Sequence, residues 1–200
     1  IPTWNSANMI HQCLGCLAQQ TIQDFEIIII DNASLDGSVK KKKEKWSNLT
    51  FQIEKLDENK GYATANNIGV RLARGKWLAL LNADAFPEPD WLEKLLHAAE
   101  ENPEYEFFAS RQIQATSPDL LDGAGDAYHI TGLAWRRHYN QLMQAYGHQA
   151  EEVFSACPTA ALYSREEFLK VGGFDEDYFS YFEDLDLGFR LRLSGAKCLY

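Results

Sequence analysis

A nearly uninterrupted apolar run, residues 77–81, leads directly into the polar tripeptide Asn82-Ala83-Asp84. A continuous apolar run is typical of a strand buried on both faces, so helices must cover the sheet above and below it. In open α/β sheets, ligands lie beyond the carboxyl ends of the strands. A carboxylate at that position can bind a hard divalent cation through oxygen. The run therefore predicts an α/β fold with a ligand site near Asp84.

The remaining apolar residues alternate between strand-like and helix-like spacing. Residues 25–30 are a second buried, β-branched run, and Ser164 begins a capping-box pattern that predicts a helix. This βαβα order predicts a mostly parallel central sheet with helices on both faces. We expect strands at residues 25–30, 51–56, 77–81, 106–110 and 154–163, and helices at residues 6–20, 63–74 and 91–101, from Ser164, and in a last segment that ends near Gly195.

Charge and length restrict the partners of this chain. Two hundred residues with 46% hydrophobic content suit one globular domain, and both ends read as strands cut short, so we expect residues 1–200 to be a single truncated domain. The formal net charge of -10 argues against nucleic acid or an anionic membrane surface as the main partner. An anionic ligand would therefore need a cation to bridge it. No apolar run is long enough for a membrane-spanning helix.

The four cysteines do not form a recognisable metal or disulfide framework. Cys13 and Cys16 resemble half of a zinc site, but no second pair completes it, so we interpret them as buried structural thiols. Unpaired cysteines fit a reducing compartment. We therefore expect a cytoplasmic location, which includes the cytoplasmic face of a membrane.

Two segments have no single interpretation. The lysines of residues 40–45 are typical of a solvated helix face rather than a phosphate site. Residues 115–150 contain Gly123 and Gly125, but Tyr128 breaks the dinucleotide-binding pattern. That stretch could be an acceptor-binding loop or an ordinary surface excursion. Its basic and aromatic residues are Tyr128, His129, Trp135, Arg136, Arg137, His138, Tyr139 and His148.

A second acidic cluster, Glu183-Asp184-x-Asp186, starts the last helical segment about a hundred residues after Asp84. Carboxylates at a helix N-terminus are stabilised by the helix dipole, so capping explains one of the three. The cluster also follows an aromatic segment, residues 178–182. Aromatic walls beside a carboxylate can form a pocket that keeps a base poised for proton transfer. Asp186 and Arg190 have the i,i+4 spacing of a helix-surface ion pair.

Taken together, the chain resembles an inverting glycosyltransferase of glycosyltransferase family 2, with a GT-A-type, Rossmann-like sandwich, and especially its bacterial rhamnosyltransferase-like members. The motifs occur in the order of that family and cover almost the whole chain. They are Pro2-Thr3-Trp4-Asn5, Asp31-Asn32-Ala33-Ser34-x-Asp36-Gly37-Ser38, Asn59-Lys60-Gly61-Tyr62 with Asn66 and Gly69, Leu81-Asn82-Ala83-Asp84, Gly172-Gly173-Phe174-Asp175, and Phe182-Glu183-Asp184-Leu185-Asp186-Leu187.

The resemblance implies a nucleotide-sugar site. Trp4 would stack on the base, Asp31 would accept hydrogen bonds from base or ribose, and Lys60 would contact phosphate. The donor would be a nucleoside-diphosphate sugar of UDP or dTDP type. The residues implied to bind it are Pro2, Thr3, Trp4, Asn5, Asp31, Asn32, Ser34, Lys60, Gly61, Asn66 and Asn82.

The resemblance also implies the chemistry. Asn82-Ala83-Asp84 matches the Asp-x-Asp motif of the family, with Asp84 as ligand to Mg or Mn on the diphosphate. Asp184 would be the general base and Glu183 its neighbour at the acceptor site. The acceptor would be a glycan or lipid-linked glycan in cell-surface polysaccharide or glycolipid synthesis. Two features depart from the family: Asn82 replaces the first Asp, and none of the five histidines matches its downstream metal-site His.

Other function classes fit the residues less well. A nucleotidyltransferase would carry a Gly-rich loop after its first strand, but residues 2–6 contain no glycine. A haloacid-dehalogenase-type phosphatase would have a second Asp two residues after Asp31, where Ala33 stands. A non-catalytic module that binds a nucleotide sugar or glycan remains the main alternative to transfer.

Overall fold

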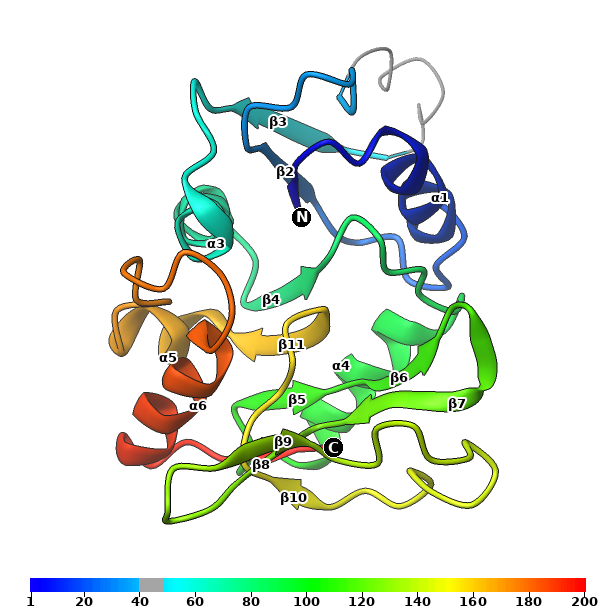
Figure 1. Cartoon of the computed structure of the whole chain (residues 1–200), viewed down its shortest axis with the longest axis vertical. Coiled ribbons are helices and arrows are strands. Elements are labelled where there is room, and N and C mark those ends of the chain that lie inside the picture. The colour runs from blue at the N-terminus through cyan, green and yellow to red at the C-terminus, as the bar shows by residue number, and fades with distance from the viewer. Residues whose placement is uncertain (40–48) are drawn as a thin grey trace.

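The computed structural model describes residues 1–39 and 49–200. Figure 1 shows the arrangement of the elements along the chain. The predicted basic helix face at residues 40–45 lies outside the described residues. Within the described ranges, no helix is both long and apolar enough to span a membrane.

The first sheet is fully parallel. Strands β1 (Pro2–Thr3), β2 (Ile27–Asp31) and β3 (Phe51–Lys55) pair in that order, and Thr3 stands opposite Asp31 in the register. The β-branched residues of β2 favour an extended backbone, and four of its five residues are buried. The carboxyl ends of β1 and β2 therefore meet at one edge of the sheet.

The second sheet is mixed. Its order is β10 (Glu152–Val153), β12 (Cys198–Leu199), β5 (Phe107–Ala109), β11 (Ala160–Ser164) and β4 (Trp77–Leu81). Strands β5 and β12 are parallel, whereas β11 runs antiparallel to both β4 and β5. The antiparallel strand arises because the chain makes an excursion over residues 110–159 before it returns to the sheet.

Helices cover both faces of this framework, as predicted. Helices α3 (Gly61–Leu72), α5 (Arg165–Lys170) and α6 (Glu183–Leu193) pack on one face, where Phe107 is buried among them. Helix α4 (Trp91–Glu101) packs on the other face against Phe108, and α1 (Ala7–Leu17) packs on the same side against β2. Neighbouring residues of one strand thus enter different cores, as the period of two requires.

The unassigned stretch after residue 110 contains two small antiparallel sheets. Strands β6 (Arg111–Gln114) and β7 (Ser117–Ala124) form one, and β8 (Asp126–Tyr128) and β9 (Ala134–Arg136) form the other. Sequence periodicity did not predict these strands because β6–β7 contains register shifts and β8 and β9 have only three residues each. The excursion is therefore ordered structure that packs beside the second sheet (Figure 1).

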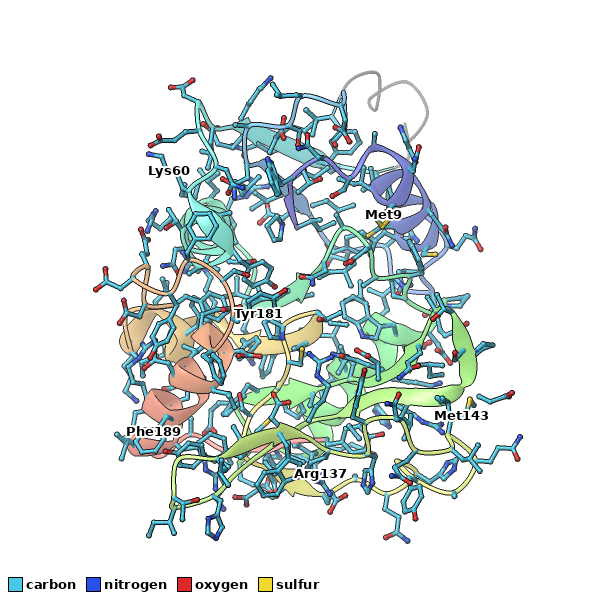
Figure 2. All side chains as sticks on the ribbon, in the orientation of Figure 1. Met9, Lys60, Arg137, Met143, Tyr181 and Phe189 are labelled. Atoms are coloured by element: carbon cyan, nitrogen blue, oxygen red, sulfur yellow. The ribbon has the colours of Figure 1, made fainter. Side chains whose placement is uncertain are left out.

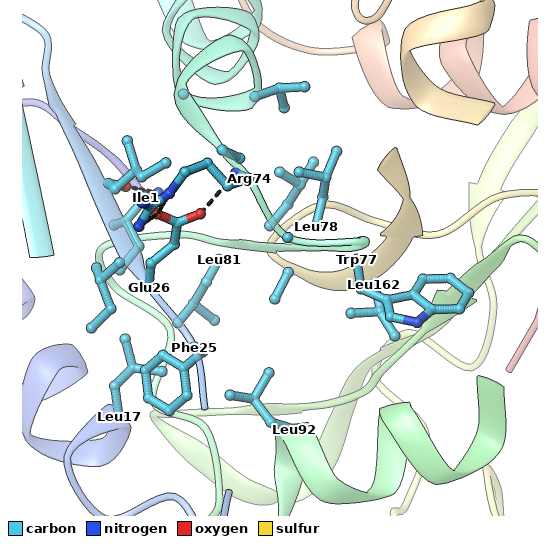
Figure 3. A pocket seen from close by; sticks show the side chains of 18 of the residues that line it. Ile1, Leu17, Phe25, Glu26, Arg74, Trp77, Leu78, Leu81, Leu92 and Leu162 are labelled. Atoms are coloured by element: carbon cyan, nitrogen blue, oxygen red, sulfur yellow. Dashed lines mark hydrogen bonds and ion pairs between the residues drawn. The ribbon is translucent and has the colours of Figure 1, made fainter. Parts of the chain in front are cut away.

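A cavity of about 820 Å³ separates the edges of β2 and β4. Its lining is largely apolar, and the Glu26–Arg74 ion pair (2.9 Å) lies beside it (Figure 3). Pro2 and Asn66 line it, but Asp84 and Asp184 do not. The carboxylates predicted to carry the chemistry therefore lie outside this cavity.

Helix α3 holds the segment that precedes α6 through one buried amide. Asn67 Nδ2 donates to Phe174 O (2.8 Å), and Phe174 N donates to Asn67 Oδ1 (2.9 Å). A Cβ on Gly173 would lie 2.6 Å from Asn67 Oδ1, so the glycine allows this close approach. The Gly172-Gly173-Phe174-Asp175 motif thus fixes the path of the chain toward α6.

Candidate active site

The adjacent ends of β1 and β2 present two buried polar atoms that lack a partner among residues 1–39 and 49–200. Thr3 and Asp31 are 3% and 0% exposed. Asp31 Oδ1 accepts a bond from Ser34 N (3.0 Å), whereas Asp31 Oδ2 and Thr3 Oγ1 have no hydrogen-bond partner within these described ranges. Buried polar groups are normally paired, so we expect a ligand to donate a hydrogen bond to Asp31 Oδ2.

The loop after β2 fastens the segment between β1 and α1. Asn5 N donates to Ser34 Oγ (2.9 Å), and Leu35 N donates to Asn5 Oδ1 (2.9 Å). Asp36 Oδ2 accepts from Ala7 N (2.8 Å), so Asp36 satisfies the start of α1. Ser6, at the N-cap position of α1, makes no side-chain capping bond, and the Asn5 side chain bonds to Leu35 instead.

Trp4, within that segment, is 56% exposed. Its ring is therefore accessible for stacking on a planar group.

Asn32 bridges β2 and the start of α3. Its side chain accepts from Lys60 N (2.8 Å) and donates to Gly61 O (3.0 Å). Gly61 has φ +83°, and a Cβ there would lie 2.4 Å from Phe179 O. The sequence-predicted residues Asn32, Lys60 and Gly61 are thus brought together, and the Lys60 side chain remains exposed. Asn66 Nδ2 bonds to Tyr62 O (3.0 Å), one turn earlier in the helix.

The end of β4 carries the metal-binding prediction. Asn82 Oδ1 accepts from Tyr62 Oη (2.8 Å), and Asp84 is exposed in the turn that follows the strand. In residues 1–39 and 49–200, no group of three or more His, Cys, Asp and Glu side chains could hold a metal ion. Asp84 by itself offers one carboxylate, which fits a cation that takes its other ligands from phosphate and water.

The start of α6 carries the second acidic cluster. Glu183 is 6% exposed, and its Oε2 has no partner in the described structure. Burial raises the pKa of Glu183 to about 7, and it also raises the pKa of the half-buried Asp184. Asp186 pairs with Arg190 (2.6 Å), which confirms the predicted i,i+4 ion pair.

The aromatic segment before α6 has two parts. Phe179 O accepts from Tyr62 N (2.7 Å), so this part is fixed on the start of α3. Tyr181 and Phe182 have positive φ values of 73° and 69°, and they are 80% and 63% exposed. Figure 2 shows Tyr181 near the middle of this face, between α3 and β11. An exposed aromatic surface therefore adjoins the carboxylates.

Tyr62 links the two acidic regions. Its hydroxyl bonds to Asn82, and the charges of Glu183 and Asp184 contribute to the raised pKa of Tyr62, after burial and Cys157. Asn82 therefore contacts this tyrosine, and Asp184 lies close enough to affect its pKa. The structure thus brings the end of β4 and the start of α6 into one region. The two motifs, about a hundred residues apart in the sequence, did not by themselves reveal this proximity.

Two residues of this region were not predicted as site residues. Asp126 on β8 is 5% exposed and stands opposite Arg136 on β9 in the register. In the sequence, Arg136 stood out only as one of the basic residues of the stretch 115–150. Both interact electrostatically with Asp184. Their position could be found only from strand pairing, because neither belongs to a motif of the resemblance.

The sequence has clear relatives. The model of the family described as "Glycosyl transferase family 2" matches residues 1–172. An N-acetylglucosaminyl-diphospho-decaprenol L-rhamnosyltransferase of Mycobacterium tuberculosis is 27% identical, over 99% of this chain and 71% of its own length. The chain spans 35% and 54% of the length of the first two curated glycosyltransferases that it matches, those of Haemophilus influenzae and Haloferax volcanii.

Solved structures share the fold. TarS 1–349 of Staphylococcus aureus in complex with UDP-GlcNAc has a TM-score of 0.73 at 18% identity, covering 99% of this chain and 53% of that one. The mannosyltransferase PcManGT of Pyrobaculum calidifontis, in complex with GDP-Man and Mn²⁺, has a TM-score of 0.72 at 20% identity, covering 98% and 52%. These likenesses confirm the predicted GT-A-type α/β fold.

The buried Glu183 predicts a pH-dependent stability. Because its pKa of about 7 in the folded chain exceeds its ordinary value of 4.5, the folded state holds an extra proton between these values. Stability must therefore fall as pH rises through that range. At about 1.4 kcal/mol per pKa unit, Glu183→Gln should gain on the order of 1–3 kcal/mol relative to the native chain between pH 5 and pH 8.

Urea unfolding at the two pH values measures this difference. Glu166 is exposed, and Glu166→Gln serves as the matched control: its free energy of unfolding should change between the two pH values by the same amount as that of the native chain. If the free energy of unfolding of Glu183→Gln also changed by that amount, Glu183 would not carry a raised pKa.

Proposed function

This chain belongs to glycosyl transferase family 2, and we propose that it moves a sugar from a nucleoside-diphosphate sugar to an acceptor hydroxyl with inversion at the anomeric carbon. The observation that carries the proposal is Asp184, a half-buried carboxylate with a raised pKa at the start of α6, whose charge reaches Tyr62, the residue that bonds to Asn82 at the end of β4. A base on one side and a diphosphate site on the other is the arrangement that in-line displacement requires.

The donor site we propose begins at the ends of β1 and β2. The unpartnered Asp31 Oδ2 and Thr3 Oγ1 suit hydrogen-bond donors and acceptors on a base or ribose. The exposed ring of Trp4 suits stacking on the base. Similar structures were solved with UDP-GlcNAc and with GDP-Man. For this chain we propose a donor of UDP or dTDP type.

The diphosphate needs a counter-charge, because the chain itself carries a formal charge of -10. Asp84 would hold Mg or Mn, with phosphate oxygens and water as the remaining ligands. When bound, such a cation supplies a Lewis acid to the departing diphosphate. Lys60, exposed at the start of α3, would add a positive charge to the proposed site.

The bond changes of transfer then follow. The acceptor oxygen forms a bond to the sugar C1 from the face opposite the diphosphate. The C1–oxygen bond to the diphosphate breaks, and its electron pair leaves with the phosphate. An alcohol is a poor nucleophile until its proton is removed, so Asp184 takes that proton during the attack.

Asp184 is the better base of the two neighbouring carboxylates. It is half-buried and so accessible to an acceptor, whereas Glu183 is 6% exposed. One Asp184 oxygen also accepts from Leu185 N (2.8 Å), which fixes its orientation at the helix start. We assign Glu183 to the wall of the acceptor site, where its poorly solvated surroundings raise its pKa to about 7.

The acceptor we propose is a glycan or a lipid-linked glycan. The exposed Tyr181 and Phe182 next to the base would pack against the apolar face of a sugar ring. A curated relative is named as a rhamnosyltransferase acting on a diphospho-decaprenol. The pathway we propose on this basis is the synthesis of a cell-surface polysaccharide or glycolipid.

The metal assignment predicts coupled binding. Calorimetric titration of the protein with UDP or dTDP should show at least about tenfold tighter binding with Mn²⁺ than without it. Mn²⁺ alone should bind weakly, because Asp84 is a single exposed carboxylate. Asp84→Asn should abolish the gain from Mn²⁺, whereas the nearby Asp90→Asn should keep it. Equal nucleotide affinity with and without Mn²⁺ would contradict the role of Asp84.

The base assignment predicts loss of transfer without loss of donor binding. Asp184→Asn should lower the turnover of the donor by about 10²-fold or more, since a general base contributes about 10²–10⁴-fold. Nucleotide affinity should remain within about twofold. Asp186→Asn, which removes a carboxylate from the same helix, is the control and should retain most activity. Undiminished turnover in Asp184→Asn would exclude it as the base, and nucleotide binding without turnover in the native protein would favour a non-catalytic module.

A further inference from the structure

Asp126 lies directly beside the backbone that carries Asp184. Asp126 N donates to Ser155 O (2.9 Å), and Phe154 N donates to Asp126 O (3.0 Å). Ser155 Oγ in turn donates to Asp184 O (3.0 Å). A Cβ on Gly188 would lie 2.5 Å from Ser155 Oγ, so the glycine lets α6 approach the segment that carries Ser155 closely. Residues 126, 155 and 184 therefore form one continuous contact.

Arg136 brings a positive charge to the same place. It pairs with Asp126 in the β8–β9 register, and it donates to Asp122 Oδ2 (2.6 Å) and to Cys157 Sγ (3.1 Å). A Cβ on Gly123 would lie 2.6 Å from the Arg136 side chain, so the glycine leaves room for it. The guanidinium is thus fixed from two sides, and its charge acts on both Asp126 and Asp184.

The Asp126 carboxylate has no structural use that would explain its burial. It is 5% exposed, and its Oδ2 has no hydrogen-bond partner in the described structure. Burial and, to a smaller degree, the charge of Asp184 raise the pKa of Asp126 to about 7, against the opposing charge of Arg136. An unpaired buried carboxyl is costly and is retained where its charge has a function.

We propose that Asp126 and Arg136 are positioning residues that set the basicity of Asp184. This inference rests on the proposed role of Asp184. The Leu185 N–H and, to a smaller degree, the Arg136 charge stabilise the Asp184 carboxylate, and in this proposal Asp184 loses its proton before Asp126 and is available as a base. Asp126 keeps its proton until near-neutral pH, and when it ionises its charge makes Asp184 a stronger base.

Other groups act on this pair from the elements packed around it. Arg136 is the cation that interacts with both Asp126 and Asp184. Glu183 precedes Asp184 on α6 and interacts with its charge. The remaining titratable groups that interact with Asp126, Asp184 or Arg136 are Tyr62, Asp122, Cys157, Tyr163 and Cys198. Two strongly interacting carboxyls lose their protons in two steps that belong to the pair.

The proposal predicts specific changes in titration. In protein labelled with ¹³C at the Asp carboxyls, Arg136→Met should raise the first step, that of Asp184, because the loss of a neighbouring cation raises a carboxyl pKa. Arg136→Lys should restore most of it. Asp126→Asn should remove the second step near pH 7 and leave the first nearly unchanged. Asp184→Asn should lower the pKa of Asp126 and so identify the two signals.

Arg137→Met is the matched control. Arg137 neighbours Arg136 in sequence but pairs with Glu151 (2.5 Å). Figure 2 shows it at the lower part of the molecule, away from Tyr181. Its loss should leave both titration steps in place. A first step that is the same in Arg136→Met and Arg137→Met would overturn the proposal.

This titration needs no substrate, so its outcome is separate from that of the proposed function. If the native protein turns over a donor, the acidic limb of its pH–rate profile should move upward in Arg136→Met by the same amount as the first titration step. Turnover with an unmoved limb would leave the glycosyltransferase function standing and would remove Arg136 and Asp126 from it.

Discussion

The contact between helix α6 and Ser155 is the constraint on which the site depends. Gly188 allows the helix to approach Ser155, whose Oγ donates a hydrogen bond to Asp184 O (3.0 Å) and so fixes the backbone there. The same residue pairs with Asp126 through its main-chain oxygen. A larger side chain at position 188 would move the helix, and with it the carboxylates, away from Ser155. Precise placement of a base within hydrogen-bond reach is what proton transfer demands.

Electrostatics explain why this placement has chemical value. Glu183, Asp184 and Asp126 are three carboxyls in a poorly solvated region, and burial raises the pKa of each. A raised pKa makes an ionised carboxylate a stronger base, but it also favours the protonated form. Arg136 counters that second effect. By contrast, Asp84 is exposed and far less constrained, as suits a ligand that shares its cation with a substrate.

The sequence predicted the framework and the two acidic motifs because both depend on local patterns. The apolar runs at β2 and β4 and the capping box at Ser164 required no knowledge of distant contacts, and Ser164 Oγ does accept from Glu167 N (3.4 Å). Arg136 and Asp126 were missed because their meaning arises from strand pairing and from a helix nearly fifty residues away. Asn67 was likewise overlooked beside Asn66, although Asn67 makes the long-range bonds to Phe174.

The central claim is displacement at C1 with Asp184 as the base, and the configuration of the released sugar tests it most directly. The protein would be incubated with UDP-GlcNAc, dTDP-rhamnose and Mn²⁺ in the absence of acceptor, so that water takes the place of the acceptor hydroxyl. Proton NMR would record the anomer that appears before mutarotation. The account predicts that the first product has the configuration opposite to that of the donor. A product that retains the donor configuration would contradict it.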